Sequence, residues 1–271
     1  LHLRINKLLS EGTDVIYDAT NLNRKRRIHL IHNEIKADEY HAYYFNTSFG
    51  KCLHNDSQRE RTVGFDVLNR MYLTAQIPTI HEGWNGIEYI NQDFKLSQFY
   101  KERLEEILSD EEPSHDYLME EISQVIDTFK DVYNVPHDSK YHSFSISRHI
   151  FYVYDFVMKN YKSNRKKEML VASLFHDLGK GWSKSFINHK GEEKRYASYI
   201  GHEFVSAQQA CYWLSLLGYD DNFIKYVVDL IQFHMTPMNM SAKQEKKVRE
   251  LLTVEQYEDL MFLHSADLNA K

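Results

Sequence analysis

Several residues of this sequence have side chains and a spacing suited to binding metal ions. His176 and Asp177 are adjacent, within the run Leu174-Phe175-His176-Asp177-Leu178-Gly179-Lys180. Other candidate ligands lie on separate segments, about 25 to 33 residues apart along the chain: His149, His202, His234 and Asp267. Imidazole and carboxylate ligands together suit a borderline or hard divalent cation such as Mn, Fe, Co, Ni or Zn. One such residue on each helix of a bundle would converge on a shared centre of one ion or two.

The segments that carry these residues have helical periodicity. Apolar residues recur at i, i+3 and i+4 near residues 145–161, 166–178, 201–217, 220–234, 241–252 and 254–270. His149 lies beside the apolar stripe of its segment. Residues 169–175 are almost entirely apolar, so we expect His176 and Asp177 where a buried helix ends, with Gly179 as its stop. Only helical patterns follow Tyr141, which predicts an all-α second half.

Residues 137–271 resemble the HD-domain metal-dependent phosphohydrolase superfamily. The resemblance is carried, in the order H…HD…H…H…D, by the HD run quoted above together with Ser147-Arg148-His149, Gly201-His202-Glu203, Phe233-His234 and Ala266-Asp267-Leu268. It implies that one metal ion is bound by His149, His176, Asp177 and Asp267. It implies, less specifically, a second ion bridged by Asp177, with His202 and His234 among its ligands. Some mononuclear members carry such histidines near the substrate phosphate, so both arrangements stay open.

The expected chemistry is hydrolysis of a phosphoester. A divalent cation lowers the pKa of bound water and offsets the charge of phosphoryl oxygens. His176 and Asp177 are the central catalytic candidates, and Lys180 could neutralise phosphate or simply be a cation at a helix C-terminus. His142 is a candidate substrate contact. For each histidine the alternative is an ordinary hydrogen-bonded structural residue.

The first ninety residues alternate between helical and strand patterns. Helices are expected near residues 1–10, with a stop at Gly12, and near 24–36, 50–60 and 66–76. Strands are expected at residues 15–17 and 40–45. This alternation predicts an α/β layer with a parallel sheet. The apolar run 15–17 ends at Asp18, and a carboxylate at the C-terminal end of a parallel strand points into the crevice where such sheets bind ligands.

Residues 1–91 resemble part of the P-loop polynucleotide kinase family. The resemblance is carried by Asp18-Ala19-Thr20-Asn21, Arg59, Arg61, the run from Gly64 to Met71, Pro78 and Glu82-Gly83-Trp84. It implies that Asp18 acts toward an acceptor hydroxyl and that Arg59 and Arg61 belong to a phosphate-binding lid. Asp18 as a turn residue and the arginines as an exposed basic helix are the alternatives. ATP and Mg are the implied cofactors of an intact kinase.

The sequence departs from that family in one large respect. No G-x-x-x-x-G-K-[ST] loop occurs in the chain, so the β- and γ-phosphates of ATP have no cradle. The chain as given is therefore not expected to transfer phosphate. It begins at Leu1 within an amphipathic helical pattern and stops at Lys271, four residues after a candidate ligand, so we expect it to be a fragment of a longer protein.

We therefore expect three parts: a kinase-like α/β part over residues 1–91, a charged helical linker over 92–136 and an HD domain over 137–271. The formal net charge of −6 gives no global attraction to nucleic acid. Two cysteines, no signal-peptide pattern and no run of 18 apolar residues favour a soluble, cytoplasmic protein.

The leading hypothesis is a nucleic-acid end-healing enzyme. Its HD domain would remove a 3′-phosphate or open a 2′,3′-cyclic phosphate, and its kinase-like part would phosphorylate 5′-OH ends in the intact protein. One alternative is a phosphohydrolase of a small nucleotide, a dinucleoside polyphosphate or an alarmone. Another is a regulatory protein whose kinase half is inactive.

Overall fold

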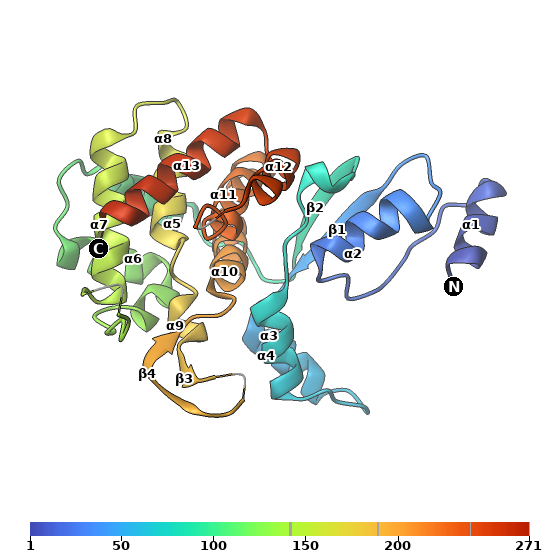
Figure 1. Cartoon of the computed structure of the whole chain (residues 1–271), viewed down its shortest axis with the longest axis horizontal. Coiled ribbons are helices and arrows are strands. Elements are labelled where there is room, and N and C mark those ends of the chain that lie inside the picture. Colours follow the sequence, from blue (N-terminus) through green and yellow to red (C-terminus); the bar gives the residue numbers. More distant parts are fainter. Residues whose placement is uncertain (141–142, 189, 239, 271) are drawn as a thin grey trace.

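The computed structural model describes residues 1–140, 143–188, 190–238 and 240–270. His142, the candidate substrate contact, lies outside these residues. The first part of the chain contains α1 (His2–Ser10), α2 (Arg24–His29), the π-turn η1 (Leu30–Glu34), β1 (His41–Asn46), α3 (Phe49–Ser57), α4 (Phe65–Thr74), η2 (Ile80–Glu82) and β2 (Gly86–Asn91). The helical bundle lies at one end of the molecule and α1 at the other, with α2, β1 and β2 between them (Figure 1).

Most of the elements predicted for this half are present. The helix predicted over residues 24–36 forms as α2 and η1, and the Asn23 side chain caps it by accepting from the Arg26 backbone N–H at 3.1 Å. β1 pairs in parallel with β2, a strand that the sequence patterns did not predict, from His41 opposite Gly86 to Asn46 opposite Asn91. This two-stranded pair is the parallel sheet found among the described residues, and it agrees with the prediction of an α/β fold for the N-terminal half.

The prediction of a strand at residues 15–17 was wrong. These residues form no strand, and the Ile16 side chain is 97% exposed. A buried parallel strand needs neighbours on which to pair, and this three-residue run lies on the surface instead. Asp18 is consequently an exposed residue of a loop and does not stand at the end of a strand.

Residues 92–136 contribute to the core of the helical domain. They hold α5 (Gln98–Ser109), α6 (His115–Val125) and η3 (Asp127–Asp131). Each helix is charged on its outer face but buries an apolar face in the same core as the C-terminal helices, with Leu104, Ile107, Leu118, Met119 and Ile122 almost inaccessible. The expectation of a solvated linker therefore does not describe this segment.

The remaining helices form the bundle that the sequence predicted: α7 (Ile146–Asn160), α8 (Lys166–Phe175), α9 (Lys180–Ser183), α10 (His202–Leu216), α11 (Asp221–Phe233), α12 (Ala242–Leu251) and α13 (Val254–Asn269). Between α9 and α10 lies an antiparallel hairpin, β3 (Ser185–Ile187) and β4 (Glu193–Ser198), which was not predicted. Its strands are short and exposed, so the apolar alternation that identifies a half-buried strand is weak there.

The two halves are packed together through side chains and backbone. Trp182 of α9 packs against Phe49 and Tyr72, with ring centroids 4.7 and 5.5 Å away, and its indole N–H donates to Asn69 Oδ1 at 2.8 Å. At a second contact the Arg24 guanidinium stacks 4.2 Å from the centre of the Phe233 ring. The α3–α4 unit thus packs directly against α9, the short helix that follows the His-Asp pair.

Candidate metal centre

The candidate ligands lie at or near the ends of five helices. His176 follows the last residue of α8, His234 follows the last residue of α11, and His202 is the first residue of α10. His149 lies near the start of α7, and Asp267 lies in the last turn of α13. The chain turns directly after α8 and α11, so each of those turns begins with an imidazole. These residues converge as predicted.

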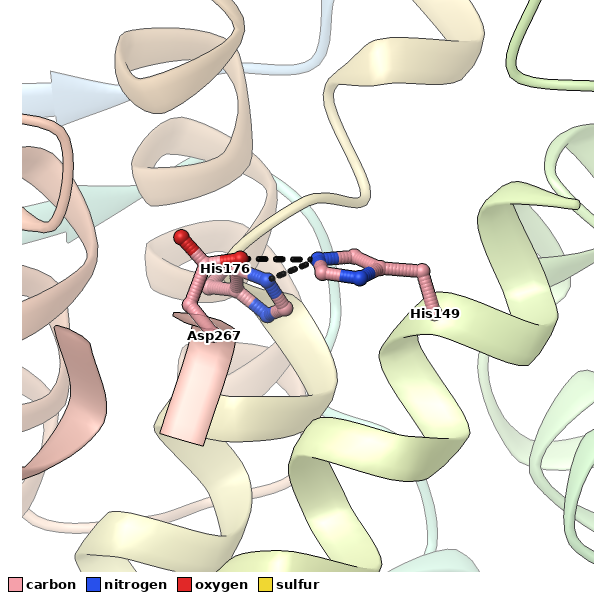
Figure 2. A group of neighbouring side chains, drawn as sticks. All are labelled: His149, His176 and Asp267. Atoms are coloured by element: carbon pink, nitrogen blue, oxygen red, sulfur yellow. Dashed lines mark hydrogen bonds and ion pairs between the residues drawn. The ribbon is translucent and has the colours of Figure 1, made fainter. Parts of the chain in front are cut away.

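One group of ligand atoms joins α7, the end of α8 and α13. His149 Nε2 lies 3.0 Å from Asp267 Oδ1 and 3.3 Å from His176 Nε2 (Figure 2). The ligand atoms of these three residues all lie within 4.8 Å of one another. Figure 2 shows the three side chains pointing toward one another from separate segments.

A second group joins Asp177, His202 and His234, whose ligand atoms also lie within 4.8 Å of one another. The Nε2 atoms of His202 and His234 are 3.2 Å apart. Asp177 Oδ1 is 3.2 Å from His202 Nε2 and 3.7 Å from His234 Nε2.

The Asp177 carboxylate faces both groups. While Oδ1 faces the second group, Oδ2 lies 3.1 Å from His149 Nε2 and 3.4 Å from His176 Nε2. Each oxygen of one carboxylate is therefore directed at a different pair of imidazoles.

The hydrogen bonds of the four imidazoles show that this site fits a cation. In each ring Nδ1 is paired with a backbone carbonyl: Ala270 for His149, Ser173 for His176, Tyr199 for His202 and Ile231 for His234, at 2.7 to 2.9 Å. Because a carbonyl only accepts, Nδ1 carries the hydrogen and a neutral ring turns the lone pair of Nε2 inward. Two such Nε2 atoms 3.2 or 3.3 Å apart repel each other unless a metal ion or a proton lies between them. The backbone contacts are those that fix metal-binding histidines in other proteins.

Burial and charge set the protonation of the metal-free site. Burial lowers the pKa of His149, but its hydrogen bonds with Asp177 and Asp267 outweigh this effect and raise that pKa to about 9. Burial alone would raise the pKa of Asp177, yet the Lys180 ammonium and the neighbouring imidazoles hold it well below the usual range. Burial would likewise raise the pKa of Asp267, but its hydrogen bond with His149 outweighs burial and lowers that pKa. Both carboxylates are therefore ionised and ready to bind a cation.

Lys180 lies inside the site. Its Nζ is 2.6 Å from Asp177 Oδ2 and 2.9 Å from His137 Nε2, and the residue is buried. His137, which sequence reasoning missed, is also buried, and its ring centre lies 5.5 Å from that of His149. Among the histidines of the chain, 15 in all, nothing in the spacing distinguishes His137. Only the packing of residues 134–138 against β4 and α9 brings it to the centre.

Two glycines allow the backbone to approach closely near the ligands. Gly179 was expected to end α8; it follows that helix in the chain, and its φ of −64° is one that any residue can adopt. Its role is close packing, since a Cβ there would lie 2.3 Å from the His202 carbonyl oxygen. Gly201, directly before α10, has a φ of 81°, and a Cβ there would lie 2.1 Å from the Leu73 carbonyl oxygen. α10 therefore begins where α4 and the turn after the His-Asp pair meet.

The N-terminal candidates do not join this centre. Arg59 and Arg61 are exposed on the loop between α3 and α4, which projects away from the bundle (Figure 1). Asp18 is exposed on the loop before α2. None of the described helices is long and apolar enough to cross a membrane.

Comparison with known proteins supports the assignment of the second half. The family model described as the HD domain matches residues 141–267, a span that contains all six candidate ligands. No match was found among the curated proteins or among the solved structures. HD domains bind divalent metals and act as metal-dependent hydrolases, and the buried histidine and aspartate groups described above are compatible with that chemistry. The match therefore supports an HD domain over residues 141–267.

Proposed function

We propose that this protein is a metal-dependent phosphohydrolase with a centre for two divalent ions. The observation that carries the proposal is the position of Asp177, whose two carboxylate oxygens face two different pairs of imidazoles. His149, His176 and Asp267 would hold one ion, His202 and His234 the other, and Asp177 would bind both. The imidazole and carboxylate donors suit Mn, Fe, Co, Ni or Zn.

The ions would supply a water molecule of lowered pKa and positive charge for the phosphoryl oxygens. The chain itself contributes orientation, because the bonds from the four Nδ1 atoms to backbone carbonyls fix the direction of each Nε2. Lys180 is buried, and its Nζ lies 2.6 Å from Asp177 Oδ2. Where a metal ion neutralises that carboxylate, the charge of Lys180 would be available to an anionic substrate.

We further propose that the substrate is a phosphoester of a nucleotide or of a nucleic-acid end. At a nucleic-acid end it would be a 3′-phosphate or a 2′,3′-cyclic phosphate. A fused 5′-OH kinase part that uses ATP and Mg belongs to the same proposal for a longer protein. It is supported by the sequence resemblance of residues 1–91 and by the parallel β1–β2 pair. The exposed position of Asp18 and the missing P-loop argue against kinase activity of this chain as it stands.

The metal centre is tested by changing Asp177→Asn, which replaces one carboxylate oxygen with an amide nitrogen that does not bind metals. We expect the variant to purify with at most one ion per chain by elemental analysis. Hydrolysis of a phosphoester with added Mn, Co or Ni should fall by at least about 100-fold. Glu258→Gln, an exposed carboxylate of α13, is the matched control and should behave like the unchanged protein.

The substrate is tested by comparing a 2′,3′-cyclic nucleotide, a 3′-phosphorylated oligonucleotide and free nucleotides under the same conditions. Preference for the oligonucleotide end supports end healing. Faster cleavage of free nucleotides, dinucleoside polyphosphates or alarmones favours the small-molecule alternative. A protein that carries no transition metal and hydrolyses none of these compounds would be the regulatory protein instead.

A further inference from the structure

A cavity of about 410 Å³ lies beside the metal centre. Its volume is within the range of small-molecule sites, about 300–1,000 Å³. It lies between the segment that leads to α7 and the strand β4. Its lining includes His137, Asp138, Phe144, Arg195 and Tyr196.

Hydrogen bonds and an ion pair join the two walls of this cavity, the segment before α7 and the region of β4. The Ala197 backbone N–H of β4 donates to the Asp138 carbonyl at 2.9 Å, and the Tyr199 hydroxyl donates to the His137 carbonyl. The Lys184 ammonium pairs with the Asp138 carboxylate at 2.7 Å. These contacts hold together two segments that are far apart in the sequence, so the cavity between them is a stable part of the fold.

His137 connects the cavity to the metal centre. Its imidazole lines the cavity, while its Nε2 accepts from Lys180 at 2.9 Å and its ring lies beside that of His149. His137 therefore lies between the cavity and the ligand groups, in contact with both. A position in the cavity suits the part of a substrate that adjoins the reacting phosphate.

The residues that line the cavity indicate the chemistry of the substrate part that binds there. Phe144 and Tyr196 contribute aromatic rings to the lining, and Ser139, Ser143 and Ser145 contribute hydroxyl groups, of which Ser145 Oγ also accepts from the Arg148 backbone N–H. The charge of Asp138 is balanced by Lys184. Arg195 forms no ion pair among the described residues, and its guanidinium lies 5.2 Å from the centre of the Tyr196 ring. Aromatic faces stack on nucleobases, and a guanidinium binds phosphate through paired donors. The cavity thus combines an uncompensated cation with surfaces for a base and a sugar.

We propose that this cavity binds a nucleotide that carries a second phosphate in addition to the one hydrolysed. The base lies against Phe144 and Tyr196, and Arg195 binds the phosphate that is not cleaved. This proposal rests on the proposed phosphohydrolase function for the orientation of the substrate. Both a free nucleoside bisphosphate and the terminal nucleotide of a nucleic-acid strand have the required second phosphate.

The test compares equilibrium binding of adenosine 3′,5′-bisphosphate and adenosine 3′-monophosphate by calorimetry. We expect the unchanged protein to bind the bisphosphate about tenfold more tightly, as a charge-assisted contact to one phosphate would give. Arg195→Ala should bind both ligands equally. Lys190→Ala, an exposed cation of the same hairpin that does not line the cavity, should keep the preference. Arg195 is exposed, so its replacement should leave the melting temperature unchanged.

A second variant separates the base from the phosphate. Phe144→Leu should weaken the binding of both ligands by a similar factor, roughly tenfold, because stacking does not depend on the second phosphate. Phe144 is chosen because the Tyr196 ring also contacts the Arg195 guanidinium. Equal affinity of the unchanged protein for both ligands, or an undiminished preference in Arg195→Ala, would overturn the proposal. A dinucleotide with a 3′-phosphate that binds more tightly than the bisphosphate would identify the strand end as the source.

Hydrolysis distinguishes this proposal from the proposed function. If Mn, Co or Ni support cleavage of the 3′-monophosphate at equal rates in the unchanged protein and in Arg195→Ala, while binding shows no preference, the function stands and the cavity proposal fails. If the binding preference depends on Arg195 but no metal supports cleavage, the cavity is a nucleotide site and the phosphohydrolase proposal fails.

Discussion

At the scale of single residues, the metal centre depends on Asp177, whose carboxylate faces both groups of candidate ligands and Lys180. Its carboxylate is ionised, buried and close to Lys180 and four imidazoles. Lys180 and a metal ion would interact with the same oxygen, Oδ2. The lysine therefore stabilises the metal-free protein, and a bound ion would take over part of that role.

Changing Lys180→Met should lower the melting temperature of the metal-free protein and enlarge the rise that added Mn or Co produces. A buried carboxylate that loses its partner costs about 3–5 kcal/mol, and a metal ion would restore the missing charge. Lys159→Met is the control, because Lys159 forms a similar 2.7 Å pair with Asp155 on the surface and such pairs contribute about 0–1 kcal/mol. Equal metal-induced shifts in both variants would contradict this role of Lys180. The measurement is thermal unfolding with and without metal.

A second residue-scale effect concerns Asp229 of α11, which lies away from the ligands. Burial raises the pKa of its carboxyl group from 3.8 to about 7, although the Arg24 charge and bonds from Gln232 and Gln256 act in the opposite direction. The folded chain keeps this proton up to about pH 7, whereas the unfolded chain releases it near pH 4. Folding therefore takes up a proton in this window, and the free energy of unfolding decreases as the pH rises through it.

Asp229→Asn should remove this contribution. At pH 8 the variant should be more stable than the unchanged protein by about 1–4 kcal/mol, and the difference should shrink toward pH 4. Urea unfolding at several pH values measures it. A variant that is less stable at pH 8 would show that the ionised carboxylate contributes favourably through Arg24.

At the scale of elements, helix ends determine where the ligands meet. The turn after α8 packs so tightly against the start of α10 that only glycine fits at position 179. Its backbone N–H donates to Ser206 Oγ at 2.8 Å, which joins the two elements. The position of His202 therefore depends on the turn that carries His176 and Asp177.

Gly179→Ala should destabilise the fold by about 1–3 kcal/mol, because the added methyl group would force the two backbones apart. It should also reduce metal bound by His202 and His234 more than metal bound by the other group. Gly50→Ala is the control: Gly50 lies in α3, where an added methyl group would meet nothing within 4 Å, and alanine is favoured in helices. Elemental analysis and urea unfolding check both variants. Unchanged metal content in Gly179→Ala would count against the coupling of the two elements.

At the scale of the whole molecule, the N-terminal half is packed on the HD domain. Phe49, Tyr72 and Asn69 surround Trp182, and Gln208 of α10 donates to the Tyr72 carbonyl at 2.8 Å. This contact lies next to α9 and the start of α10, both of which border the metal centre. A change in the position of α3 and α4 would therefore act on Lys180 and His202.

Trp182→Ala should lower the free energy of unfolding by about 2 kcal/mol, less than for a fully buried tryptophan because the side chain is 39% exposed. It should also lower the rate of phosphoester hydrolysis although Trp182 is not a ligand. Phe94→Ala, whose side chain is 97% exposed, is the control and should change neither quantity. Full activity in Trp182→Ala would show that the HD centre functions independently of the α3–α4 contact.

The ligand types and the helices that carry them could be predicted from the order of residues alone. Helical periodicity is a local property, so α7, α8, α10, α11 and α13 could be predicted to within a few residues. The order of histidines and aspartates sufficed to predict an HD domain, which the family match over residues 141–267 supports.

The remaining features depend on tertiary packing. Residues 15–17 are apolar but pair with no strand, and α5 and α6 look solvated by composition yet supply part of the core. His137 reaches Lys180, 43 residues later, and Asp177 faces two pairs of imidazoles only because distant helices end at one place. Such contacts join segments with no local pattern in common, since they depend on which surfaces pack together rather than on the residues beside them in the chain.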